Sequence, residues 1–188
     1  MTGMRVSFLL VLVPAVALAD GVALADASTP DKPPPATTLA VGDRAVTVGF
    51  GADWKIHVRV TGGGELVLEP AGQAYVGHDA WTVRAELVDG AAPVPLVKVT
   101  SRPEACGDYW DTYVSIVDGV PHKALELFGL ADPPAMATPS VKFARDGTAV
   151  VTLRTEEDEK LVRTKRTRYR FDGRVYVELS KRAGTRSK

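Results

Sequence analysis

The dipeptide Asp-Gly recurs four times along this chain, and it constrains the fold more than any other feature. It occurs at 89–90, 118–119, 146–147 and 172–173, at spacings of 29, 28 and 26 residues, each time between two strand-like runs. Asp-Gly in such a setting is the strongest short-range signal for a β-hairpin, because glycine accepts the positive φ that a tight turn needs. We therefore expect hairpin to follow hairpin along the chain.

From residue 45 onward, apolar residues recur at every second position, and no segment shows the 3.6-residue period of a helix. Valine, threonine and aromatic residues are frequent in these runs, as half-buried strands require. The expected fold is an all-β antiparallel meander of about ten strands that closes as a small barrel or folds into a two-layer sandwich. The candidate strands are 45–50, 54–60, 65–69, 80–88, 93–99, 109–117, 120–128, 139–144, 148–155, 160–170 and 174–180.

The parity of the flanking residues predicts the loop length at the turn around 146–147. The apolar residues Val141, Phe143, Ala149 and Val151 are all odd-numbered. A two-residue loop would pair odd with even positions and divide these residues between the two faces, which register does not tolerate when one face is buried. A three-residue loop pairs Phe143 with Ala149 and Val141 with Val151. We therefore predict a type I turn with a glycine bulge over residues 145–147.

The same argument applies to the last turn, around 172–173. Tyr169 before the turn and Val175, Val177 and Leu179 after it are again odd-numbered. The parity rule therefore predicts a three-residue loop over residues 171–173.

The N-terminal segment has the features of a secretory signal. Arg5 supplies a positive charge, residues 6–19 form an apolar run, and Ala-Leu-Ala marks cleavage points after Ala19 and Ala25. The prolines that follow favour an extended linker. The expected divisions are a signal peptide at 1–25, a Pro-rich linker at 26–44, an all-β domain at 45–180 and a basic disordered tail at 181–188.

These features predict an exported, soluble protein of the periplasm or the extracellular medium. The apolar run of 14 residues is shorter than the roughly 20 that span a bilayer. A lipid anchor would need a cysteine directly after the signal, and the only cysteine is Cys106. A single cysteine also makes no internal disulfide.

Composition and motifs give no direct indication of a reaction or a cofactor. The chain has 23 Lys and Arg against 23 Asp and Glu, so we expect no nucleic acid partner. Nucleophile elbows, zinc-protease motifs, phosphate loops and dinucleotide fingerprints are missing from the sequence. The loop spacing that converges on calcium is missing as well. We therefore expect no metal and no cofactor.

Two residue groups remain as candidate binding sites. Arg166, Arg168 and Arg170 share the even-numbered face of one predicted strand, about 7 Å apart, and suit an anionic polymer or an acidic protein surface. The region from residue 142 onward carries 14 Lys and Arg against 7 Asp and Glu. The alternative is a solvated outer face that discourages edge pairing, with its charges neutralised within the molecule by the acidic residues at 156–159 and by the acidic N-terminal part of the domain.

The second group is His78 with Asp79, in a turn-like stretch. Of the other two histidines, His57 is expected to face solvent from a strand. The preferred hypothesis is a non-enzymatic envelope or secreted binding module that uses a strand face. The alternative is a small secreted enzyme whose polar site is assembled by the fold from His78, Asp79 and other residues.

Overall fold

The chain folds into two antiparallel sheets, of four and eight strands. The computed structural model describes residues 33–69, 81–88, 90, 92–103, 107–132, 134–158 and 160–179. The expected signal peptide, the first part of the expected linker, Cys106 and the expected tail lie outside these residues. Within them, the prediction of an all-β chain without helices is confirmed.

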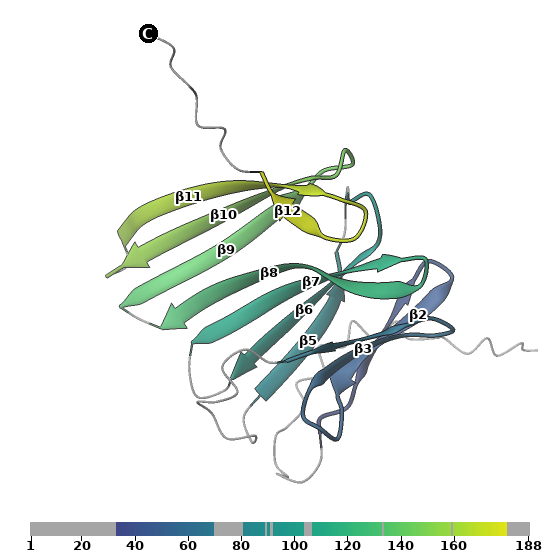
Figure 1. The fold of residues 1–188 in the computed structure, drawn as a ribbon. Helices are drawn as coiled ribbons and strands as arrows, with labels where there is room; N and C mark the ends of the chain where they lie inside the picture. The colour runs from purple at the N-terminus through teal and green to yellow at the C-terminus, as the bar shows by residue number, and fades with distance from the viewer. Residues whose placement is uncertain are drawn as a thin grey trace, which may run out of the picture.

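Both sheets are meanders in which every strand pairs with its neighbours in sequence (Figure 1). The small sheet contains β1 (Thr37–Val41), β2 (Arg44–Phe50), β3 (Ile56–Val60) and β4 (Glu65–Leu68). The large sheet contains β5 (Trp81–Leu87), β6 (Leu96–Pro103), β7 (Asp108–Val117), β8 (Val120–Asp132), β9 (Ala135–Phe143), β10 (Thr148–Glu157), β11 (Lys160–Phe171) and β12 (Tyr176–Glu178).

The first strand begins earlier than the sequence indicated. β1 lies within the segment expected as a linker, and Thr37 pairs with Val48 of β2. Leu39 and Val41 of this strand pack into the core, whereas the threonines beside them stay exposed. The prolines before Thr37 hid this short alternating pattern, so the domain starts before the predicted Ala45.

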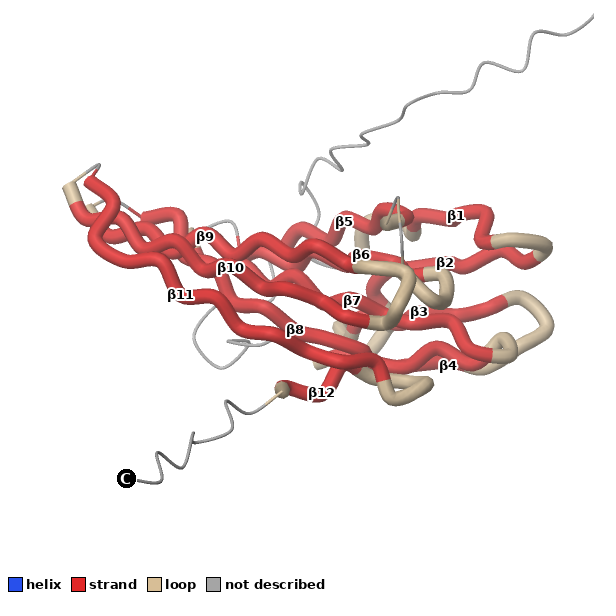
Figure 2. Tube along the Cα trace, turned by 90° about the horizontal axis from the view of Figure 1, so that it is seen from above, coloured by secondary structure: helices blue, strands red, loops and turns tan. Residues whose placement is uncertain are grey.

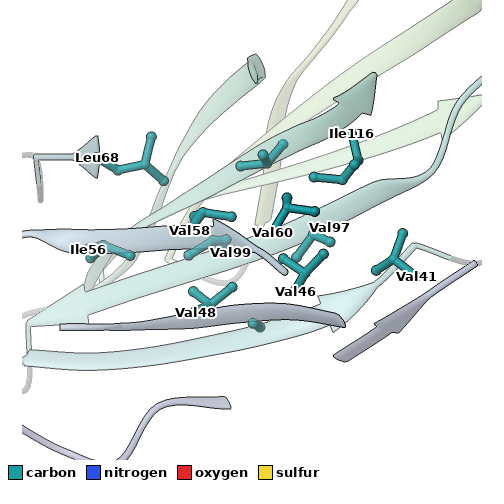
Figure 3. Close-up of a cluster of buried hydrophobic side chains, with 12 residues drawn as sticks. Val41, Val46, Val48, Ile56, Val58, Val60, Leu68, Val97, Val99 and Ile116 are labelled. Atoms are coloured by element: carbon teal, nitrogen blue, oxygen red, sulfur yellow. The ribbon is translucent and has the colours of Figure 1, made fainter. Parts of the chain in front are cut away.

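A valine-rich core joins the small sheet to one end of the large sheet (Figure 3). Val46, Val48 and Val58 are at most 1% exposed and pack with Val97 and Val99 of β6. Figure 2 shows the small sheet beside β5–β8, while β9–β11 extend beyond it. The two-layer arrangement therefore covers only part of the large sheet.

A second, aromatic cluster holds the other end of the large sheet. β8 and β9 pair only over residues 130–132 and 135–137, and beyond these residues the strands diverge (Figure 1). The ring of Phe143 lies 5.2 Å from those of both Tyr113 and Tyr176, measured between centroids. Tyr113 belongs to this aromatic cluster, whereas its neighbour Val114 belongs to the valine core. Because successive side chains of a strand point to opposite faces, the β9–β12 end packs on the face of β7 opposite to the small sheet.

No closed barrel forms, so that alternative is wrong. The large sheet stays open, with β5 at one edge and β12 at the other. Closure requires the end strands to pair edge to edge. The small sheet instead packs its valines against the face of β5–β7, so it forms a layer and not a continuation of the same sheet.

The predicted three-residue turn between β9 and β10 is confirmed. Phe143 pairs with Ala149 and Val141 with Val151, as parity required. Gly147 has a φ of 80°, and its N–H donates to the carbonyl of Ala144 over 3.0 Å.

The predicted three-residue turn between β11 and β12 is wrong. Phe171 pairs with Tyr176, and the N–H of Asp172 donates to the carbonyl of Val175 over 3.0 Å, so the loop has only two residues, Gly173 and Arg174, and pairs an odd with an even position. Tyr176 fills the aromatic cluster and is 6% exposed. Burial of this large ring outweighs that of the odd-numbered aliphatic residues, and Val177 is left 51% exposed.

Candidate functional site

The three arginines of β11 lie together on an exposed sheet face. Arg166, Arg168 and Arg170 are exposed, whereas Tyr169 and Phe171 of the same strand are half-buried. The period-two alternation of a strand separates the two sets. The arginine row that the sequence predicted is therefore a solvent-facing surface of β11.

The neighbouring strands extend this cationic surface. The ladder places Arg168 opposite Val150, and Val150 opposite Lys142 of β9. Arg154 of β10 stands on the same face, opposite Thr164. We name the resulting set the basic face; it consists of Lys142, Arg154, Arg166, Arg168 and Arg170, all exposed.

Short hydroxyl side chains separate the cations of the basic face. The register places them beside or between the charged residues, and no acidic residue occupies this face over residues 138–154 and 164–170. Hydroxyls both donate and accept hydrogen bonds. The hydroxyl residues are Thr138, Ser140, Thr148, Thr152 and Thr164.

The positive charges of the basic face are not neutralised by ion pairs. All ion pairs found among the described residues join residues between Asp43 and Glu126, and none includes a member of the basic face. Glu156, Glu157 and Asp158, which would neutralise it under the alternative interpretation, form no ion pair within the described part of the chain. The guanidinium groups therefore remain available to an external anion.

The opposite face of β9–β11 holds the basic face in place. Its apolar residues pack into the aromatic cluster, and Ala149 and Val151 are 0% and 7% exposed. Because one face is buried, a shift of register would expose these residues and bury the cations. The spacing of the arginines is thus fixed by the core and does not depend on a flexible loop.

A histidine cluster on the small sheet was missed by the sequence analysis. His57 Nδ1 lies 2.5 Å from Glu65 Oε1, and Nε2 lies 2.9 Å from Asp53 Oδ1. The hydrogen bond with Glu65, followed by that with Asp53, raises the pKa of His57. The same bonds lower the pKa of both carboxyl groups. The Arg59–Glu65 cross-strand pair, set by the glycine-rich turn, was the signal that could have revealed this cluster.

This histidine cluster is satisfied within itself. Both ring nitrogens of His57 face a carboxylate, and Arg59 Nε donates to Glu65 Oε1 over 2.8 Å. The two carboxylates stand at opposite ends of the ring, so the three groups do not converge on one ion position. Among the described residues, no group of three or more potential ligands is arranged to hold a metal ion.

A second polar cluster contributes Glu86 and Lys98 to a groove of about 600 Å³ that lies between β5–β7 and residues 141–143 of β9. Lys98 Nζ lies 3.1 Å from Asp111 Oδ2 and 3.5 Å from Glu86 Oε1, and Asp111 is buried. Thr100 Oγ1 donates to Asp111 Oδ1 over 2.6 Å. Burial raises the pKa of Tyr113 in the groove wall. The lysine is shared by two carboxylates, which leaves it no free charge for a ligand.

The other predicted site, His78 with Asp79, lies outside the described residues. No helix long and apolar enough to cross a membrane occurs in the part of the chain that is described. Comparison of the chain with models of protein families, with curated proteins and with solved structures finds no match.

Proposed function

We propose that this chain is an exported, non-enzymatic binding module whose basic face engages an anionic macromolecule. The observation that carries the proposal is the cluster of five exposed cations on β9–β11, which form no ion pair among the described residues, although Asp146 lies near Arg170 and Glu156 follows Arg154 on the same face of β10. Export is supported by the signal-like N-terminal sequence.

The chemistry of the face suits extended anions. A guanidinium group presents a planar fork of donors that matches a carboxylate or a phosphate in a two-pronged hydrogen bond. Three such forks in line, about 7 Å apart, match a chain that carries negative charges at a regular spacing. The hydroxyl groups between them supply further hydrogen bonds to the same ligand.

The test uses poly-glutamate as the probe, with affinity measured at about 50 mM and about 200 mM salt. The variant Arg166→Gln/Arg168→Gln/Arg170→Gln removes three charges from the basic face. The matched control, Lys160→Gln/Arg163→Gln/Lys165→Gln, removes three exposed charges from other positions of the same strand. Both variants have the same net charge, so only the position of the loss differs.

We expect the arginine variant to lose at least about tenfold in affinity and to bind with a weaker salt dependence, because charge-assisted bonds are lost. The control should lose much less. Equal losses in the two variants would show that net charge alone attracts the polymer, and they would contradict a site on the basic face.

A further inference from the structure

The basic face borders an open sheet edge. β12 pairs with β11 only over Tyr169–Phe171, and the N–H of Leu179 adds one bond to the carbonyl of Arg168, at 2.8 Å. Residues 160–167 of β11 have β10 on one side and no strand on the other among the described residues. An edge of this length offers a row of backbone donors and acceptors to another chain.

The directions of the backbone groups along this edge follow from two bonds. The N–H of Phe171 donates toward β10, to the carbonyl of Gly147 over 2.8 Å, whereas the carbonyl of Arg168 accepts from β12. Residues of an antiparallel strand alternate in which neighbour they bond. The N–H and C=O of Thr164 and Arg166 therefore point to the open side.

Side chains at the edge show which kind of strand fits there. A strand paired with residues 160–167 places alternate side chains opposite Thr164 and Arg166 on the basic face, and the one opposite Arg166 lies diagonal to Arg168. Leu161 and Val162, which are 53% and 61% exposed, lie at the far end of the same edge. A partner residue directly opposite an arginine completes an ion pair when it is acidic.

Charge excludes two other occupants of the edge. A second copy of this chain, paired antiparallel through β11, would bring two arginine rows together, and like charges on paired strands are destabilising. The chain's own residues 180–188 carry four Lys and Arg and no acidic residue. Both occupants would add positive charge beside the basic face.

We propose that the partner is an extended acidic segment of another protein, which adds to the open edge of β11 as an antiparallel strand and aligns alternate acidic residues with Thr164 and Arg166, so that the residue opposite Arg166 also lies diagonal to Arg168. This inference rests on the proposed function, because it names the partner of the same face. Main-chain hydrogen bonds supply affinity in strand addition, and alternate side chains supply specificity.

The probe is a ten-residue peptide of alternating Glu and Thr, compared with a block peptide of the same composition. A glutamate opposite Arg166 directs its own N–H at β11, because directly opposite residues of a hydrogen-bonded pair exchange both bonds. N-methylation of the glutamates should therefore abolish binding. N-methylation of the threonines, whose N–H groups point away, should preserve it.

The matching change in the protein is Thr164→Pro. Proline removes one outward N–H and keeps every charge of the basic face, and it is tolerated on an edge strand where the N–H faces solvent. We expect Thr164→Pro to weaken the alternating peptide by about tenfold, the value of one or two hydrogen bonds, and to leave poly-glutamate binding through side chains largely intact. Thr164→Val, which keeps the N–H, is the control.

The outcomes separate the two proposals. Preference for the alternating peptide, with loss on glutamate N-methylation, supports strand addition even where Thr164→Pro does not fold. Strand addition is overturned if the alternating and block peptides bind with equal affinity, or if N-methylation of the glutamates does not change the affinity. In either case the basic face remains a binding site as long as the triple arginine variant binds poly-glutamate more weakly than the wild type does. Equal affinity of the wild type and the triple arginine variant for poly-glutamate overturns both proposals.

Discussion

At the scale of single residues, the charged clusters differ in whether their charges have partners of opposite sign within the chain. His57 is held by two carboxylates and Lys98 by two others, so their charges are balanced inside the molecule. The arginines of the basic face form no ion pair among the described residues, although Arg170 lies near enough to Asp146 to help lower the pKa of that carboxyl group. Residue type alone does not reveal this difference, because it depends on which strands lie side by side.

The histidine cluster predicts how stability changes with pH. The pKa of His57 is raised above 6.5 in the folded chain, so its contribution is fully present below about pH 6.5 and is lost as pH rises through the folded value. The pKa values of Asp53 and Glu65 are lowered, so their contribution is present above their unfolded values and is lost as pH falls through the folded ones. The cluster therefore stabilises the fold most at mildly acidic pH.

We expect His57→Gln to lower the Tm more at about pH 5.5 than at about pH 8.5. Thermal unfolding of the wild type and the variant across this range measures the difference. Lys55→Gln is the control, because it breaks a neighbouring surface pair with Glu69 and leaves the histidine in place. A destabilisation by His57→Gln that grows with rising pH would contradict the assignment of a charged His57 between Asp53 and Glu65.

At the scale of elements, the sequence analysis located the strands well and their registers less reliably. All eleven expected strands overlap strands of the structure, because alternation and Asp-Gly turns are local signals. β1 was missed because prolines precede it. The predicted register of β11 with β12 was wrong because the ring of Tyr176 packs against those of Phe143 and Phe171. These contacts form only in the folded chain, so the local sequence pattern does not show them. The alternation of residues along one strand was enough to predict the arginine row. The places of Lys142 and Arg154 on the same face became visible only from the pairing of β9, β10 and β11.

The β9–β10 turn gives a direct test of its glycine bulge. Gly147 has a φ of 80°, a left-handed conformation that costs other residues about 1–2 kcal/mol. An added Cβ would lie 3.4 Å from the Cβ of Phe171, an ordinary contact, so the backbone and not a clash sets the cost. We expect Gly147→Val to lower the free energy of unfolding in urea by this amount. Gly147→Asn should lower it less, because asparagine tolerates the left-handed region, and equal effects would contradict this turn assignment.

At the scale of the whole molecule, the two ends of the large sheet have different roles. The small sheet covers β5–β7 through the valine core, and the aromatic cluster supports β9–β12 from the inner side. This leaves the outer face of β9–β11 as an exposed surface of the large sheet with a fixed charge pattern (Figure 1). We propose that this face is the binding surface.

A residue-resolved NMR titration of the chain with poly-glutamate tests this proposal most directly. The account predicts that amide and guanidinium signals of β9–β11 shift, led by Arg166, Arg168 and Arg170, while those of the small sheet stay fixed and the shifts fade as salt is added. Shifts that spread evenly over all exposed cations, or that concentrate at the groove beside Lys98, would contradict it.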